Sequence, residues 1–141
     1  MIGKLNTMNK QDLSRDEYML TGSLKRKGYD WWWHSFTGIN ENTGLEKPFF
    51  IEFFLINPSL KEDQPVFGQL PENKKNKKRP SYVMVKVGTW GNKHIQLHKF
   101  YPWKDVKINK KAPYSIHTGD CYITETETFG SVKVEGSKEH P

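Results

Sequence analysis

The sequence predicts an all-β, antiparallel protein built as a sandwich or a barrel. Three observations lead to this prediction. Short apolar runs recur between turn signals, no segment after residue 20 has a convincing helical period, and two long runs carry large aromatic side chains. A length of 141 residues fits one domain. We place that domain at residues 20–141, after an irregular segment at 1–19 that includes a short helix over 12–18.

The elements follow in order from alternation and turn residues. Residues 41–44 (Glu-Asn-Thr-Gly) predict a hairpin turn, with glycine placed for a positive φ. Residues 58–80 carry four prolines and a basic run, and they predict a long excursion with little regular structure. A last turn is expected at residues 129–130. The predicted strands are 20–26, 31–40, 47–57, 81–87, 94–101, 105–109, 114–117, 121–126 and 131–135.

The most informative run is Asp30-Trp31-Trp32-Trp33-His34. Side chains alternate along a strand, so Trp31 and Trp33 must share one face and Trp32 must take the other. The run 49–56 repeats this pattern, with Glu52 as its only charge. Large aromatics on both faces predict a strand pair that is covered on both sides. A lone carboxylate in such a run should be either paired or functional.

Charge is concentrated in one segment. The net charge is +6, and one short run between residues 74 and 79 supplies five basic residues. Such a field can attract an anionic membrane surface, nucleic acid or an acidic ligand, although a short basic run can also be only a solvated loop. The predicted anion-binding residues are Lys74, Lys75, Lys77, Lys78 and Arg79.

Several classes of protein are disfavoured. The single cysteine, Cys121, excludes an internal disulfide and is expected to be a packed small residue. No cysteine–histidine cluster predicts a metal, and no phosphate loop or catalytic triad motif predicts a cofactor or a hydrolase. No segment is apolar enough to span a bilayer, and the N-terminus has no signal-peptide core. We therefore expect a cytoplasmic protein, with peripheral membrane contact as an option.

The aromatic runs carry a resemblance to a known family. Asp30-Trp31-Trp32-Trp33 resembles the acidic-Trp-Trp-aromatic opening of lipocalin-like carotenoid hydratases. The second run, which ends in Asn57-Pro58, resembles the next strand of tocopherol cyclases. The resemblance covers about residues 20–135, and it implies a calycin- or lipocalin-like barrel or half-barrel that holds an isoprenoid or other lipid. Those cyclases place a glycine where this chain has Asp30, and they are about twice as long, so the chain resembles their N-terminal half. A second barrel domain or a second copy would then be a partner.

Cyclising or hydrating an alkene requires a proton donor in a dry pocket, and a carboxylic acid among aromatic rings can supply it. We predict Glu52 as the catalytic acid and His34 as its acid–base partner, while a purely structural Glu52 stays open. A hairpin register with His34 opposite Glu52 is favoured because it pairs the carboxylate, whereas a shift of one residue would place Glu52 beside Trp31 and Trp33. The predicted ligand-binding residues are Trp31, Trp32, Trp33, Phe36, Phe50 and Phe54.

Two alternatives without this chemistry remain. One is a lipid carrier that contacts anionic membrane through its lysine loop. The other is an OB-like domain that binds nucleic acid by stacking bases on exposed aromatic rings beside lysines. Nucleic acid is the less expected partner, because the aromatic residues fall on both faces of two apolar strands, whereas a stacking platform presents them on one exposed face.

Overall fold

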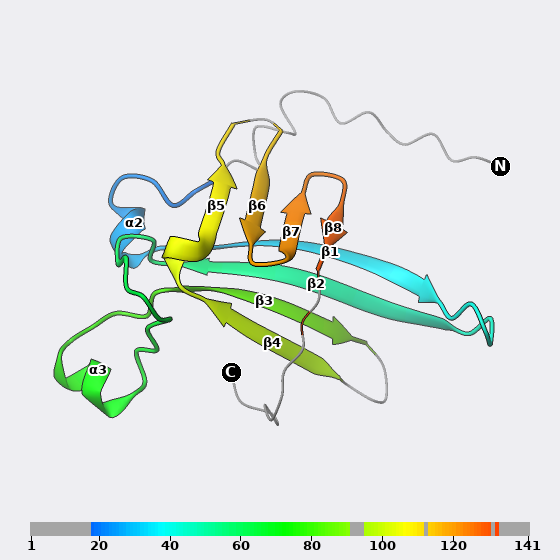
Figure 1. Cartoon of the computed structure of the whole chain (residues 1–141), viewed down its shortest axis with the longest axis horizontal. Helices are drawn as coiled ribbons and strands as arrows, with labels where there is room; N and C mark the ends of the chain where they lie inside the picture. The colour runs from blue at the N-terminus through cyan, green and yellow to red at the C-terminus, as the bar shows by residue number, and fades with distance from the viewer. Residues whose placement is uncertain (1–17, 91–94, 112, 131, 133–141) are drawn as a thin grey trace.

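The computed structural model describes residues 18–90, 95–111, 113–130 and 132, and it consists of two four-stranded antiparallel sheets (Figure 1). The first sheet is a meander of β1 (Tyr29–Ile39), β2 (Glu46–Ile56), β3 (Tyr82–Thr89) and β4 (Gln96–Tyr101). The second is a meander of β5 (Val106–Asn109), β6 (Ser115–Thr118), β7 (Cys121–Thr124) and β8 (Thr128–Phe129). Neither sheet closes on itself among these residues. The all-β antiparallel prediction is confirmed, but no closed barrel is formed.

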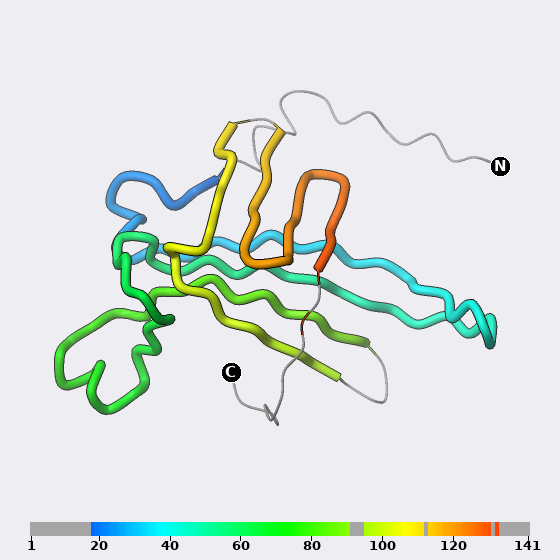
Figure 2. The backbone as a smooth tube through the Cα atoms, in the orientation of Figure 1, coloured from blue at the N-terminus to red at the C-terminus, as the bar shows by residue number. Residues whose placement is uncertain are grey.

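The β1–β2 hairpin is the longest feature of the fold, and its tip projects beyond the other strands (Figure 2). Its turn lies where the sequence predicts it. Gly44 has a φ of 68° and donates its N–H to the Asn40 carbonyl at 2.7 Å. The Asn40 side chain accepts two further backbone N–H groups, from Asn42 and Thr43. These bonds hold the tip in one conformation and so fix the pairing of the two strands.

A short helix, α2 (Leu24–Lys27), stands where we predicted a strand over 20–26, so that prediction is wrong. Its one turn is closed by the Gly28 N–H, which donates to the Leu24 carbonyl at 2.7 Å. Residues 25–27 are Lys-Arg-Lys and offer no apolar alternation that could bury one face of a strand. Leu20, in contrast, is fully buried and anchors the segment in the core.

Other boundaries also differ from the predictions. The excursion at 58–80 contains the helix α3 (Pro71–Lys75) and one isolated bridge between Val66 and Ser81. The last turn was predicted at 129–130, but Phe129 belongs to β8 (Thr128–Phe129) and a turn that we did not predict comes earlier, between β7 and β8. There the Glu127 N–H donates to the Thr124 hydroxyl at 3.0 Å. The predicted helix at 12–18 and strand at 131–135 lie, but for Tyr18 and Val132, outside the described residues.

The two sheets pack across a shared core, with the strands of the second running across those of the first (Figure 1). A single-turn 3-10 helix, η2 (Trp103–Asp105), forms the corner between them, and its Trp103 indole N–H donates to the Ile56 carbonyl at 2.7 Å. Cys121, at the start of β7, is buried in this core, as predicted. The fully buried side chains fill the space between the sheets: Leu20, Phe53, Leu55, Val83, Val85, Ile116, Thr118, Cys121 and Ile123.

Candidate functional site

The register of the β1–β2 hairpin decides which predicted site residues meet. Trp33 lies opposite Glu52, and His34 lies opposite Ile51. The favoured prediction, with His34 opposite Glu52, is therefore wrong. Packing gives the reason, because Phe53 and Leu55 are fully buried against the second sheet, which turns Glu52 to the opposite side of β2. His34 shares the core side instead, so the predicted acid–base pair is not formed.

The side of the first sheet that faces away from the second sheet is rich in aromatic rings. Trp31 and Trp33 are each 51% exposed on it, and Tyr29 is 60% exposed. The expectation that both faces of this hairpin are covered is thus not met in the described part of the chain. We call this surface the aromatic face. The strand residues that form it are Tyr29, Trp31, Trp33, Phe50, Glu52, Phe54, Tyr82, Met84, Lys86, His98 and Phe100.

Ring contacts order one half of the aromatic face. Tyr29 stacks on Trp31, with centroids 5.8 Å apart and planes inclined by 13°. The same tyrosine ring stacks on Phe54 at 5.8 Å. Stacked neighbours restrict the rotamers of these exposed side chains, so a ligand that lies on them loses little conformational freedom from the protein.

A second cluster of rings orders the other half. Phe67, from the excursion between β2 and β3, lies against Tyr82 at 5.4 Å and against Phe100 at 4.9 Å. Tyr82 and Phe100 are themselves 5.1 Å apart, edge to face. Burial raises the pKa of the Tyr82 phenol above its ordinary value. The cluster makes an apolar wall at the β3–β4 edge of the aromatic face.

One polar row crosses the centre of the aromatic face. Glu52 lies between Trp33 on β1 and Lys86 on β3. The Lys86 Nζ is 3.9 Å from a Glu52 carboxylate oxygen, and the two side chains are 22% and 21% exposed, respectively. His98 follows on β4, and its pKa is lowered by burial and, to a smaller extent, by Lys86. Glu52 is thus partly buried and paired, but its partner is a lysine.

Phe50 is the least exposed ring of this surface. It lies beneath Trp90 with centroids 4.9 Å apart, and the Lys86 Nζ sits 5.3 Å from its centroid. Gly88 makes this placement possible, because a Cβ there would lie 2.4 Å from two carbons of the Phe50 ring. Phe50 therefore supports the aromatic face from below.

The remaining predicted residues lie on the core side of β1. Trp32 meets Tyr114 edge to face at 5.9 Å. The His34 Nδ1 forms a hydrogen bond with the Thr128 hydroxyl of β8, and burial lowers the pKa of this histidine. Phe36 stacks on Phe49 at 5.7 Å near the projecting tip. The fold thus divides the predicted ligand site between two faces of the first sheet. Trp31, Trp33, Phe50 and Phe54 lie on the aromatic face, whereas Trp32 and Phe36 lie on the core side, where Phe36 is still 47% exposed.

The structure also singles out a carboxyl group that we did not predict. Asp30 shares the core side with Trp32, and its Oδ2 accepts the Met19 N–H at 3.1 Å. Burial raises the Asp30 pKa, with hydrogen bonds to the carboxylate opposing this shift in part. Burial and the Asp30 charge together raise the pKa of Tyr18 to about 12. Alternation with Trp32 could have signalled this placement, because residues two apart share a face.

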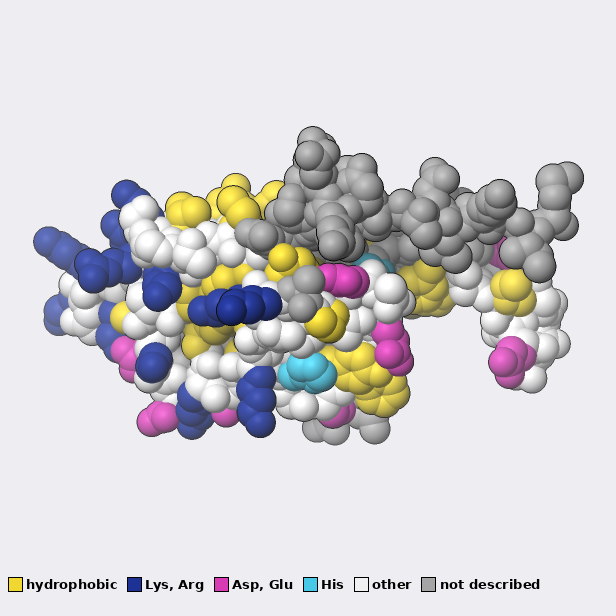
Figure 3. Space-filling view, turned by 90° about the horizontal axis from the view of Figure 1, so that it is seen from above, with side chains coloured by type: hydrophobic (Ala, Val, Ile, Leu, Met, Phe, Trp, Pro, Cys, Tyr) yellow, Lys and Arg dark blue, Asp and Glu magenta, His cyan; other side chains and the backbone are white. Residues whose placement is uncertain are grey.

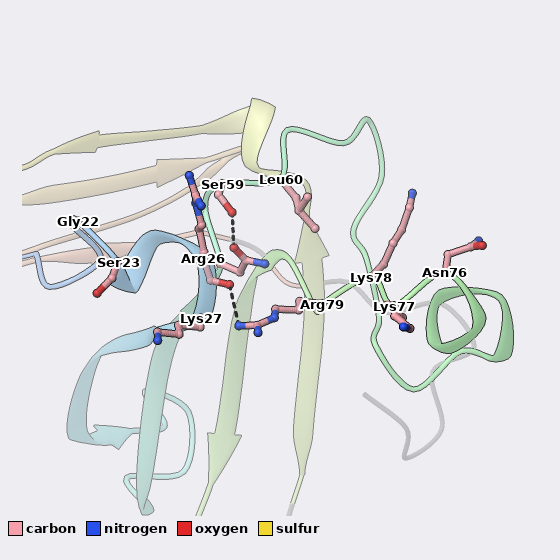
Figure 4. Close-up of a pocket in the computed structure, with 11 residues that line it drawn as sticks. Gly22, Ser23, Arg26, Lys27, Ser59, Leu60, Asn76, Lys77, Lys78 and Arg79 are labelled. Carbon is pink, nitrogen blue, oxygen red and sulfur yellow. Dashed lines mark hydrogen bonds between the residues drawn. The ribbon is translucent and has the colours of Figure 1, made fainter.

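The five predicted anion-binding residues are all exposed, as expected. Lys74 and Lys75 end α3, and the other three follow it. Lysine and arginine side chains gather at the end of the molecule that carries α2 and α3 (Figure 3). Three of the five also line a pocket that α2 and the segment after β2 complete (Figure 4). Its lining residues are Gly22, Ser23, Arg26, Lys27, Asn57, Ser59, Leu60, Asn76, Lys77, Lys78 and Arg79.

Comparisons with protein-family models, with curated proteins and with solved structures give no match for this chain. The described residues contain no group of three or more histidine, cysteine or acidic side chains that could hold a metal ion. In the same part of the chain, every helix is too short or too polar to cross a membrane.

Proposed function

We propose that this domain binds a hydrophobic small molecule, of isoprenoid or other lipid type, on the aromatic face of its first sheet. The observation that carries the proposal is that Trp31 and Trp33 are each half exposed on one face of β1. Tyr29 and Phe54 extend this aromatic surface by stacking, and Tyr82 and Phe100 extend it across β3 and β4. Exposed apolar surfaces of this kind on a folded domain mark sites of interaction. Apolar lining with a few convergent polar groups is also typical of small-molecule sites.

The packing between the sheets supports an outer site over an inner one. Phe53, Leu55, Ile116 and Ile123 are at most 1% exposed and occupy the middle of the space that a lipocalin-like barrel would offer to its ligand. Protein interiors packed in this way leave few voids larger than a water molecule. We therefore assign the ligand to the aromatic face and interpret the space between the sheets as core.

The resemblance to tocopherol cyclases and carotenoid hydratases forms part of this proposal. It is supported by the antiparallel meander, by the tryptophan triplet on β1 and by the Asn57-Pro58 pair that follows β2. A curved half-barrel completed by a second domain would use the aromatic face as its inner wall. The ligand class that the resemblance implies, an isoprenoid with a planar unsaturated part, also suits a surface of stacked rings.

A catalytic version of the proposal uses Glu52 as the proton donor, which requires its carboxyl group to be protonated and released from the ion pair with Lys86. The acid would add its proton to an alkene carbon, and the Trp31 and Trp33 rings would stabilise the cation. A phenol or water oxygen would then form the new C–O bond and release a proton to the carboxylate. Glu52→Gln should keep the fold and the bound ligand but abolish cyclisation of a prenylated hydroquinone, measured by product chromatography. Turnover equal to that of the wild type would exclude Glu52 as the proton donor, and no turnover by the wild type would leave a non-catalytic carrier.

Ligand binding itself can be tested by titration calorimetry with farnesol. We expect Trp31→Ala combined with Trp33→Ala to weaken farnesol binding about tenfold or more, since two ring contacts are lost. The matched control is Phe129→Ala, because Phe129 is an equally accessible ring, 61% exposed, on the second sheet. Equal binding by the double variant and the control would overturn the proposal.

Analytical ultracentrifugation of the wild type and of the Trp33→Ala variant tests whether a second copy of this chain covers the aromatic face. If the wild type is a dimer and Trp33→Ala is a monomer, the aromatic face is an interface between copies. A single-stranded oligonucleotide that binds more tightly than farnesol, and depends on the same tryptophans, would favour the stacking platform instead. Either result would overturn the assignment of a lipid ligand.

A further inference from the structure

The pocket between α2 and the segment after α3 has the composition of a site for a negatively charged group (Figure 4). Its cavity volume is about 800 Å³, which is within the range of small-molecule sites. Five of its eleven lining residues are cationic, and none is acidic. The cations are Arg26, Lys27, Lys77, Lys78 and Arg79.

Hydrogen bonds between distant segments hold the two walls of the pocket together. The Asn57 N–H donates to the Gly28 carbonyl at 3.2 Å, and the Ser59 N–H donates to the Lys25 carbonyl at 3.1 Å. The Arg79 guanidinium donates to the Arg26 carbonyl at 3.5 Å, across 53 residues of sequence. The first two bonds join α2 to the segment after β2. The Arg79 bond brings the cations of α2 beside those that follow α3, which two independent solvated loops would not do.

Most of these cations have no acidic partner in the described part of the chain. Lys78 forms an ion pair with Glu62 at 3.0 Å, and Glu62 is not one of the residues that line the pocket. No ion pair is recorded there for Arg26, Lys27, Lys77 or Arg79. Like charges gathered without counter-charges repel one another, and a bound anion would remove that repulsion. Planar guanidinium groups from two segments can also bind phosphate oxygens bidentately.

The pocket begins where the aromatic face ends. Lys27 precedes Tyr29 on β1 by two residues, Asn57 directly follows the end of β2, and Arg79 precedes Tyr82 on β3 by three. The aromatic face itself has a single lysine, Lys86, which is paired with Glu52. Positive charge and aromatic surface are thus separated along the strand direction. A strand of nucleic acid would need positive charge and aromatic surface together along its whole length. An amphiphile needs positive charge only at its anionic head and apolar surface along its tail.

We propose that this pocket binds the phosphate group of an anionic lipid amphiphile, whose apolar chain extends over the aromatic face. The position of the chain rests on the function proposed above, while the binding of the anion rests on the pocket alone. The sequence pointed to the lysines after α3 as an anion-binding loop. The structure adds Arg26 and Lys27, and it turns an exposed run into a two-walled site.

Titration calorimetry with three probes tests this proposal: farnesyl monophosphate, farnesol and inorganic pyrophosphate. We expect the monophosphate to bind about tenfold or more tightly than farnesol, because charge-assisted hydrogen bonds add to the same chain contacts. This advantage should shrink as salt is raised. Arg26→Gln combined with Arg79→Gln should abolish the advantage and leave farnesol binding unchanged.

The matched control removes the same charge elsewhere. Lys47→Gln combined with Lys107→Gln eliminates two exposed lysines that are outside the pocket lining, and it should keep the advantage of the monophosphate. Thermal melts of both double variants check that each is folded. An equal loss in the control would show that net charge alone, and not the pocket, attracts the anion, and would overturn the proposal.

The outcomes separate this proposal from the proposed function. If farnesol binds and the monophosphate binds no better, the pocket proposal is wrong and the aromatic face stands. If pyrophosphate binds as tightly as the monophosphate and farnesol does not bind, the pocket takes a soluble phosphate and the lipid assignment fails. An oligonucleotide that outcompetes the monophosphate and depends on both arginines would replace the lipid by nucleic acid.

Discussion

The tryptophan triplet provides a direct test of how the fold divides its aromatic residues. Replacing Trp32 by alanine should destabilise the protein most, because Trp32 packs against the core and meets Tyr114 edge to face at 5.9 Å. Core substitutions of this size cost about 3–5 kcal/mol, and a partly buried ring should fall near ~3 kcal/mol. Loss of the edge contact accounts for about 0.5–1.5 kcal/mol of that change.

Trp31→Ala and Trp33→Ala should cost less. Both side chains are 51% exposed, so each buries only about 100 Å² of the roughly 200 Å² that a tryptophan can bury. At about 25 cal/mol per Å², and after allowing for the alanine that remains, each change should cost about 1–2 kcal/mol. Trp32→Ala should therefore be the least stable of the three variants by at least ~1 kcal/mol.

Urea denaturation followed by far-ultraviolet circular dichroism measures this difference. Circular dichroism is preferable to fluorescence, because each variant removes a fluorophore. A change of this size exceeds the uncertainty of midpoint comparisons at constant slope. If Trp31→Ala or Trp33→Ala cost as much as Trp32→Ala, the aromatic face would be covered in solution, and its description as an exposed surface would be refuted.

Three further predictions concern single groups. Burial raises the Asp30 pKa above 3.8, so the stability that this group contributes is complete below that pH and is lost as the pH rises through the pKa of the folded state. Asp30→Asn should remove this acid-range dependence of the unfolding free energy in urea titrations, and an unchanged pH profile would contradict the prediction. Burial lowers the His34 pKa below 6.5, so the stability that this histidine contributes is complete above pH 6.5 and is lost as the pH falls through its pKa in the folded state. His34→Gln, which keeps a hydrogen-bond partner for Thr128, should reduce this loss of stability at low pH. Gly88→Ala should destabilise the protein by about 1–3 kcal/mol, because the added Cβ would collide with the Phe50 ring. In a double-mutant cycle this cost should vanish in a Phe50→Ala background, whereas additive changes in unfolding free energy would refute the contact.

Much of the first sheet could be predicted from the sequence, because alternation and turn chemistry act locally. The period of two separates Trp32 from Trp31 and Trp33 whatever the register. The glycine of the 41–44 turn likewise predicts the hairpin without knowledge of its surroundings. The predicted pairing of β1 with β2 was wrong by one residue. That shift places His34 and Glu52 on opposite faces of the sheet, because side chains alternate along a strand.

The features that could not be predicted depend on contacts between distant segments. An apolar run such as 49–56 looks the same whether its outer side is covered or open, so the exposure of the aromatic face required the structure. Arg26 and Lys27 gave no signal as anion-binding residues, because the role proposed for them depends on their position beside Arg79, which lies 53 residues from Arg26.

The central claim, that a hydrophobic ligand occupies the aromatic face, is tested most directly by the five tryptophan indole N–H signals in a nitrogen–proton correlation spectrum. Each signal can be assigned by single substitution and followed during titration with farnesol. We expect the Trp31 and Trp33 signals to shift with ligand concentration, while those of Trp32 and Trp103, which face the core, stay in place. Shifts at Trp32 and Trp103, with the Trp31 and Trp33 signals unmoved, would place the ligand between the sheets and not on the aromatic face.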